Sequence, residues 1–145
     1  MRAVIQRVNS AAVIVAGKET AKINKGLLVF LGVIKGDTPA EAESLANKIA
    51  QLRIFSDQNR KMNLSPQEAK AEIMVVSQFT LCADLERGRR PSFDDAAEPA
   101  LAEELYLRFI ECLKQAQLQV KQGIFKAYMT VKIENDGPVT FVLDT

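Results

Sequence analysis

An unbroken apolar run near the start of the chain, GLLVFLGVI at residues 26–34, constrains the fold most strongly. A strand with one solvated face alternates apolar and polar residues, whereas a continuous run suits a strand that is buried on both faces. The run is about half as long as a membrane-spanning helix requires. We therefore expect it to be the central strand of a sheet that is covered on both sides.

The size and composition of the chain are those of one globular domain spanning residues 1–145. Hydrophobic residues make up 48% of the chain and charged residues 26%, a balance typical of folded proteins. A chain of 145 residues can bury a core without disulfides or metal staples. Its two cysteines follow no signal peptide or membrane segment, so we expect a cytoplasmic protein with reduced thiols.

Start signals and periodicity predict two helices. Thr38 is a candidate N-cap, Pro39 suits the first helical position, and Glu41 completes a capping box, so a helix is expected from there to Arg53. A second amphipathic helix is expected over residues 102–116. The polar segment 55–63 is expected to be a loop or a short hairpin.

The remaining elements are predicted strands. Residues 3–8 and 11–15 are expected to form a hairpin around Asn9-Ser10, and residues 73–81 a core strand. A second hairpin is expected at the end of the chain, with its turn at residues 135–138. The order of elements indicates an α+β or α/β fold with a mixed sheet and two main helices.

The chain contains no histidine, which excludes whole classes of site. Ser-His-Asp and Cys-His nucleophilic arrangements lack their base, and His-ligated metal sites lack their ligands. Cys82 and Cys112 are too few for a cysteine zinc site, so we expect neither a metal nor a cofactor. A net charge of +1 argues against a general polyanion binder, although the cluster formed by Arg87, Arg89 and Arg90 suits local contact with a phosphate backbone.

Two polar segments are candidates for chemistry, and each has an ordinary structural explanation. Ser77-Gln78-Phe79-Thr80 ends the predicted core strand, where hydroxyls can simply satisfy backbone groups; strand parity would place Gln78 and Thr80 on one face. Gly137-Pro138 lies in a segment with turn composition, and X-Pro is the bond at which a cis peptide costs least. Cys82 is expected to be a small core residue.

Four motifs taken together resemble those of the D-aminoacyl-tRNA deacylase family. They are MRAVIQRV at 1–8, SQFTL at 77–81, ERGRRPSF at 86–93 and NDGPVT at 135–140. The resemblance runs from end to end of the chain. It implies an α+β fold with a compact, barrel-like mixed sheet flanked by two helices. It further implies a homodimer that hydrolyses the ester between a D-amino acid and the tRNA 3′ end, with the aminoacylated tRNA as its partner.

The resemblance also implies roles for particular residues. A cis Gly137-Pro138 peptide would enter the partner subunit's site, where its carbonyls accept hydrogen bonds from the substrate's α-ammonium group. An L-amino acid would then drive its Cβ into this backbone. Arg7 would brace the Gly-Pro segment, and Ser77, Gln78, Phe79 and Thr80 would face the scissile ester. Glycine has no Cβ, so glycyl-tRNA is expected to be a substrate.

The absence of histidine is compatible with this chemistry, because an aminoacyl ester is already activated. Main-chain N–H groups near Phe79 and Thr80, with the Gln78 amide, are the candidate oxyanion donors. Thr80 has no visible base to activate it, so the ribose 2′-hydroxyl is an alternative source of assistance. A non-catalytic RNA-binding module and a small-metabolite esterase with Thr80 as nucleophile are the alternatives. Aromatic residues make up only 6% of the chain, which argues against base stacking on an exposed sheet.

Overall fold

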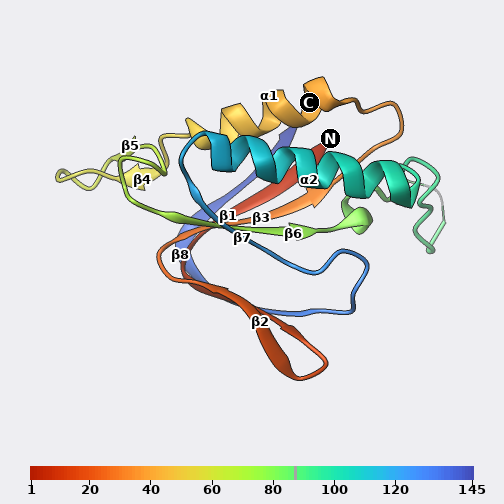
Figure 1. Cartoon of the computed structure of the whole chain (residues 1–145), viewed down its shortest axis with the longest axis horizontal. Helices are drawn as coiled ribbons and strands as arrows, with labels where there is room; N and C mark the ends of the chain where they lie inside the picture. Colours follow the sequence, from red (N-terminus) through yellow and green to blue (C-terminus); the bar gives the residue numbers. More distant parts are fainter. Residues whose placement is uncertain (87) are drawn as a thin grey trace.

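The apolar run forms the strand β3 (Gly26–Gly32) at the centre of a six-stranded mixed sheet (Figure 1). The computed structural model describes residues 1–86 and 88–145, so Arg87 of the basic cluster lies outside the described residues. β3 pairs antiparallel with β1 (Arg2–Val15) and parallel with β6 (Glu72–Ser77). The order β2-β1-β3-β6-β7 is completed by β8, which pairs with β1; the outer strands are β2 (Lys18–Ile23), β7 (Gln119–Gln122) and β8 (Thr130–Asp144).

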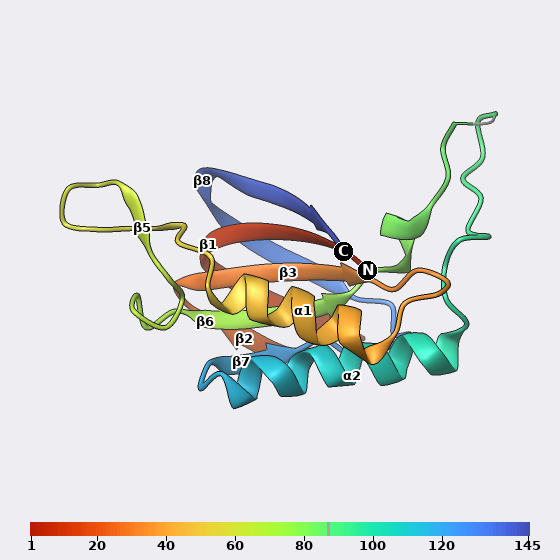
Figure 2. The ribbon, with the colours of Figure 1, turned by 90° about the horizontal axis from the view of Figure 1, so that it is seen from above.

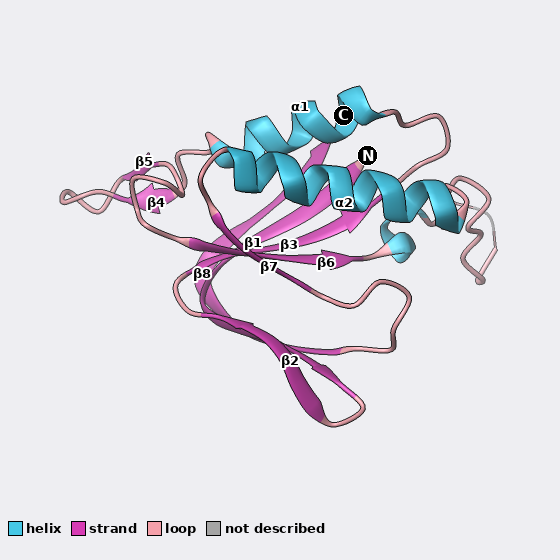
Figure 3. Ribbon diagram, viewed as in Figure 1, coloured by secondary structure: helices cyan, strands magenta, loops and turns pink. Residues whose placement is uncertain are grey.

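Both faces of β3 are buried, as the apolar run predicts. Leu27, Val29 and Leu31 belong to the larger core cluster, which the helices complete. Leu28 faces a second cluster with Val8, on the side where the long ribbon of β1 and β8 bends over the sheet. Figure 3 shows the two helices side by side on one face of the sheet. The central strand therefore links two cores in one domain.

The two helices form where the start signals and periodicity predict. α1 (Pro39–Ala50) begins at the N-cap Thr38, whose Oγ1 accepts the Ala40 N–H at 3.2 Å, while the Glu41 carboxylate accepts the Thr38 N–H at 2.8 Å. The helix ends at Ala50, one turn short of the expected boundary. α2 (Pro99–Gln115) is tied to the sheet by the buried Tyr106 hydroxyl, which donates to the Val75 carbonyl at 3.0 Å.

The predicted hairpin at Asn9-Ser10 is wrong: β1 is one continuous strand, and its turn lies at Ala16-Gly17. Val8 pairs with Asn135 and Ser10 with Glu134, so Asn9 is an extra residue in a bulge. The Ser10 hydroxyl donates to the Glu134 carboxylate at 3.1 Å across the same ribbon. Polar residues that look like a turn in the sequence thus mark a bend within a paired strand.

The predicted terminal hairpin is also wrong, because residues 130–144 form the single strand β8. Gln6 pairs with Thr140 and Val8 with Asn135, so the segment 136–139 lies opposite Arg7 alone. A proline has no N–H to donate to a ladder, and this large irregular bulge accommodates it as a turn would. The chain leaves the ladder at this segment and rejoins it in the same direction.

Two further expectations about the fold hold. The segment around residues 55–63 is the hairpin of β4 (Phe55–Ser56) and β5 (Met62–Leu64). The α+β class is confirmed: one small domain has a barrel-like mixed sheet flanked by two main helices. None of the helices in residues 1–86 and 88–145 is long and apolar enough to cross a membrane.

Candidate functional site

The strand predicted over residues 73–81 ends early, and its last part is a 3-10 helix. β6 stops at Ser77, where the Gln78 N–H still donates to the Leu31 carbonyl at 2.8 Å. The 3-10 helix η1 (Phe79–Cys82) follows at once. The expectation that Gln78 and Thr80 share a strand face is therefore wrong, because Thr80 is not in a strand.

The turn into η1 leaves two main-chain donors free beside exposed side chains. The Leu81 N–H donates to the Gln78 carbonyl at 3.2 Å, whereas the N–H groups of Phe79 and Thr80 have no protein acceptor among the described residues. The first N–H groups of a helix lack partners within it. Phe79 is 60% exposed and Thr80 is exposed. This position can hold a developing negative charge.

Close packing holds η1 against the sheet. A Cβ on Gly32 would lie 2.9 Å from the Cys82 Sγ, 3.1 Å from the Gln78 carbonyl oxygen and 3.1 Å from the Leu81 Cβ. Arg2 Nη1 also donates to the Leu81 carbonyl at 3.2 Å. Gly32 and Arg2 are supports that no prediction from the sequence named, although a glycine inside an apolar strand is a known sign of close backbone approach.

Cys82 is a structural thiol, as its expected role as a small core residue requires. It is 4% exposed, and its Sγ donates to the Val33 carbonyl at 3.3 Å. Burial raises the pKa of the Cys82 thiol. Since the thiolate is the nucleophilic form, this environment disfavours nucleophilic chemistry at Cys82.

The loop after η1 folds back against it. Asp84 and Ser92 exchange two backbone hydrogen bonds of 2.9 and 3.0 Å, which form a narrow ribbon. The rings of Phe79 and Phe93 lie 4.9 Å apart, so the returning chain contacts η1 directly. Arg89 and Arg90, the described members of the basic cluster, are exposed beyond the Asp84–Ser92 pair.

The second candidate segment is held by Arg7, which is 8% exposed. Arg7 Nε donates to the Asp136 carboxylate at 2.7 Å, and Nη1 donates to the Ile54 carbonyl at 2.6 Å. The Asn135 amide donates to the Arg7 carbonyl at 3.1 Å. The Gly137-Pro138 peptide is cis, and both residues are exposed.

The two candidate segments lie at opposite ends of the sheet (Figure 2). Arg7 pairs with Leu27 at the start of β3, whereas Ser77 pairs with Leu31 near its end. Four residues along a strand correspond to about 13 Å. The structure thus groups Ser77 with Gln78, Phe79 and Thr80, and Arg7 with the Gly-Pro segment, but a single chain does not bring the two groups together.

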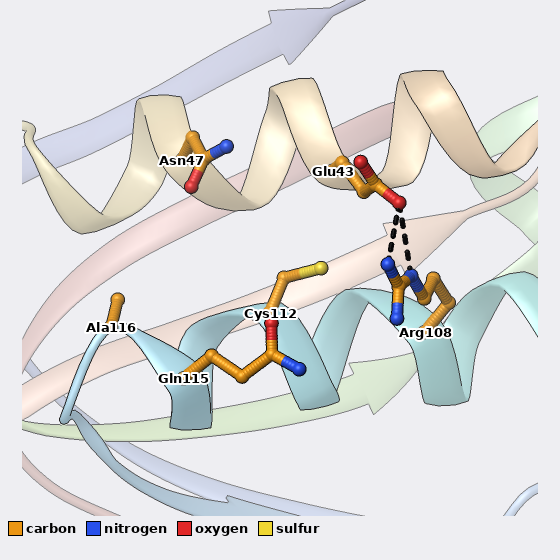
Figure 4. Close-up of a pocket in the computed structure, with 6 residues that line it drawn as sticks. All are labelled: Glu43, Asn47, Arg108, Cys112, Gln115 and Ala116. Atoms are coloured by element: carbon orange, nitrogen blue, oxygen red, sulfur yellow. Dashed lines mark hydrogen bonds and ion pairs between the residues drawn. The ribbon is translucent and has the colours of Figure 1, made fainter.

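A shallow hollow between α1 and α2 is separate from both segments (Figure 4). Arg108 donates to the Glu43 carboxylate at 2.6 and 3.1 Å and to Glu111 at 3.2 Å, so these charges satisfy one another. In the part of the chain that the structure describes, no three Cys, Asp or Glu side chains are placed to bind a metal ion.

Comparison with known proteins gives consistent matches over the whole chain. Residues 4–144 match the family described as D-Tyr-tRNA(Tyr) deacylase. A protein of Thermosipho melanesiensis named D-aminoacyl-tRNA deacylase is 57% identical over 146 residues, covering 100% of this chain and 97% of that protein. One of Persephonella marina with the same name is 55% identical, with coverage of 100% and 98%.

Two solved structures share the fold. The c-Myc DNA unwinding element binding protein superposes with a TM-score of 0.94 at 41% identity, covering 100% of this chain and 99% of that one. A probable eukaryotic D-amino acid tRNA deacylase superposes with a TM-score of 0.86, with coverage of 99% and 98%. At 17% identity, this second similarity concerns the fold alone.

Proposed function

This chain belongs to the D-Tyr-tRNA(Tyr) deacylase family, and from that premise we propose how its two candidate segments act together. The chain is a D-aminoacyl-tRNA deacylase, a hydrolase of aminoacyl-tRNA esters. The observation that carries the mechanism is the pair of free N–H groups at Phe79 and Thr80. They lie at an exposed strand end, where the ester of a bound 3′ terminus can reach them.

The proposed reaction is the attack of water on the ester carbonyl carbon. A C–O bond to water forms, and the bond to the ribose oxygen breaks after a tetrahedral oxyanion has formed; the proton from water passes to the leaving ribose oxygen. The oxyanion accepts hydrogen bonds from Phe79 N–H and Thr80 N–H, with the Gln78 side-chain amide as a third donor. Removal of one such donor typically lowers kcat about 10²–10³-fold.

We assign the acid–base help to the substrate's own 2′-hydroxyl in preference to Thr80. A threonine nucleophile needs an adjacent base. The chain has no histidine, and the described residues place no carboxylate or lysine in hydrogen-bond contact with Thr80. Positioning and oxyanion stabilisation then supply most of the rate enhancement for an ester that is already activated.

The complete site is proposed to form between two copies of the chain. The Gly-Pro segment and η1 lie at opposite ends of one molecule, so a symmetric pair can bring the partner subunit's Gly137 and Pro138 to η1, twice. β8 is an edge strand whose described neighbour is β1, and it carries the exposed apolar side chains Ile133, Phe141 and Val142. Exposed apolar side chains on a strand edge favour association.

Chiral selection is proposed to come from main-chain contacts of the Gly-Pro segment. Its carbonyls accept hydrogen bonds from the α-ammonium group, and these contacts do not distinguish one D-side chain from another. An L-residue would direct its Cβ into the backbone of Gly137-Pro138. Glycine has no Cβ to clash with this backbone. The loss of a side chain from an apolar pocket weakens transition-state binding by only ~1–3 kcal/mol. We therefore propose that glycyl-tRNA is also hydrolysed.

One experiment tests the activity and the basis of selection. D-alanyl-, glycyl- and L-alanyl-tRNA on the same tRNA body are titrated with enzyme, beside a simple D-alanine ester. We expect release from the first two, retention of L-alanine, and poor hydrolysis of the simple ester. Binding without release would favour an RNA-binding module. Retention of glycine as firm as that of L-alanine would refute the Cβ clash.

The dimer is tested by sedimentation at assay concentration, combined with subunit mixing. A chain that lacks the Gln78 amide (Gln78→Ala) is mixed with a chain altered at Gly137, and each of the two homodimers alone is expected to be weakly active. One intact site per mixed dimer should restore about half of the wild-type activity per dimer. A fully active monomer would contradict the shared site.

A further inference from the structure

The hairpin of β4 and β5, residues 53–64, is a basic projection whose only acidic residue, Asp57, forms hydrogen bonds within the turn (the basic hairpin). Asp57 Oδ1 accepts the N–H groups of Asn59 at 2.8 Å and Lys61 at 3.0 Å, and Oδ2 accepts the Asn63 side-chain amide at 3.2 Å. This carboxylate therefore organises the turn. Arg60 sits at the tip with a φ of 62°, in the left-handed region.

The cationic side chains at the tip are free to contact a ligand. Arg60 and Lys61 are exposed, and neither forms an ion pair with any described residue. Arg53, at the base, donates instead to the Asn63 carbonyl at 2.6 Å and to its side-chain oxygen at 2.7 Å. The tip also carries the exposed amides of Gln58 and Asn59. Arginine, lysine and amide side chains are the groups that contact nucleic-acid phosphates.

The base of the basic hairpin is joined to the Gly-Pro segment through one side chain. Arg7 donates to the Ile54 carbonyl at 2.6 Å and to the Asp136 carboxylate at 2.7 Å. Figures 1 and 2 place the hairpin at the end of the sheet opposite to η1. In a dimer that brings Gly137 and Pro138 to the partner's η1, the base of this hairpin would therefore lie close to that η1 as well.

We propose that the basic hairpin of one subunit binds the phosphate backbone of the tRNA whose 3′ end is in the partner subunit's site. The inference rests on the proposed function, because it needs the shared site and a nucleic-acid substrate. The net charge of +1 provides no strong overall field, so attraction of a polyanion must come from local cations. Arg60 and Lys61, at the tip of the basic hairpin, are placed to supply this attraction next to the shared site.

The test removes two charges at the tip and, as a control, two charges elsewhere. Arg60→Gln/Lys61→Gln is compared with Lys48→Gln/Lys114→Gln, which neutralises exposed lysines on α1 and α2. Neither tip side chain makes a hydrogen bond that the turn needs, because both residues contribute backbone groups alone. The Lys61 N–H donates to Asp57 Oδ1 at 3.0 Å, the Lys61 carbonyl accepts the Asp57 N–H at 2.8 Å, and the Arg60 N–H donates to the Asp57 carbonyl at 3.0 Å. Both variants should therefore fold, and a thermal scan verifies this.

The readouts are salt-dependent tRNA binding and the separation of KM from kcat. The tip variant should raise KM for D-aminoacyl-tRNA about tenfold at low salt and leave kcat unchanged. For tRNA binding by the tip variant, the slope of the logarithm of the association constant against the logarithm of the salt concentration should become less negative by about 1.5. This is the change expected for two lost phosphate contacts. D-aminoacyl-adenosine, which has no phosphate backbone, should be hydrolysed at the wild-type rate by the tip variant.

The outcomes separate this inference from the proposed function. If the wild-type enzyme releases D-amino acids but the tip variant keeps the wild-type KM and salt slope, the inference is overturned. An equal change in the helix control would attribute the effect to overall charge and overturn it as well. If the wild-type enzyme is inactive, the proposed function fails, and the salt slope for uncharged tRNA still decides the role of the hairpin.

Discussion

Substitution of Gly32 by alanine should damage the site more than the fold. The new Cβ would lie 2.9 Å from the Cys82 Sγ and 3.1 Å from both the Gln78 carbonyl oxygen and the Leu81 Cβ, against ordinary contacts of 3.4–4 Å. Relief of these contacts requires η1 to move by about 0.5 Å. Catalytic groups must be held within about that distance of their productive positions. The displaced groups include Gln78 and the N–H groups that follow it.

The expected magnitudes follow from this displacement. Overpacking in a core costs about 1–3 kcal/mol of the free energy of unfolding. For a domain of this size, that corresponds to a Tm lower by roughly 2–12 °C. Misplaced donors near the ester should lower kcat/KM for D-aminoacyl-tRNA by roughly 10- to 100-fold. The Tm is measured by calorimetry, and the rate by release of a labelled D-amino acid.

A second substitution shows whether crowding is the cause. Cys82→Ala removes the nearest atom, so Gly32→Ala/Cys82→Ala should recover part of both losses, with a coupling of at least ~0.5 kcal/mol. Cys82→Ala alone should retain most of the activity. Wild-type rate and Tm in Gly32→Ala, or strict additivity in the double variant, would refute the idea that Gly32 positions η1.

Three further substitutions test other parts of the structure. Thr80→Ala keeps the main-chain N–H and should retain substantial deacylation; a loss of roughly 10⁶-fold, as for a true nucleophile, would show that Thr80 is covalent. Arg7→Ala leaves the Ile54 carbonyl and the Asp136 carboxylate without their buried donor, so it should lower activity on D-aminoacyl-tRNA strongly and the unfolding free energy by about 1–3 kcal/mol; a wild-type rate would contradict its bracing role. Thr38→Ala removes the N-cap of α1 and should cost about 1 kcal/mol in denaturant titration with no change in kcat. Hydrogen bonds from Thr38 lower the pKa of the Glu41 carboxyl. The stabilisation linked to that lowered pKa is present above the unfolded pKa of about 4.3 and is lost as the pH falls through the folded pKa, so the gap between wild type and Thr38→Ala should narrow in acid.

Local signals in the sequence were sufficient where the interactions that define an element lie within the element itself. The apolar run at 26–34 predicted a strand buried on both faces, because side chains that alternate between the two faces of a strand are all apolar here and both faces must be covered. Thr38 and Glu41 predicted the start of α1, because a capping box satisfies donors within a few residues of itself. The four motifs in order were sufficient to indicate the family that the comparisons establish.

Tertiary structure decided what depends on neighbouring strands. Asn9-Ser10 and the Gly-Pro segment both have the composition of turns, yet each is a bulge, because β1 and β8 pair on both sides of it and carry the chain onward. The core strand ends at Ser77 because η1 packs over Gly32, a residue 45 positions earlier in the chain. The placement of η1 and the Gly-Pro segment at opposite ends of the sheet likewise follows from strand pairing, which no local pattern encodes. Turn composition specifies where a chain can leave a ladder, whereas the partner strand determines whether it reverses or continues.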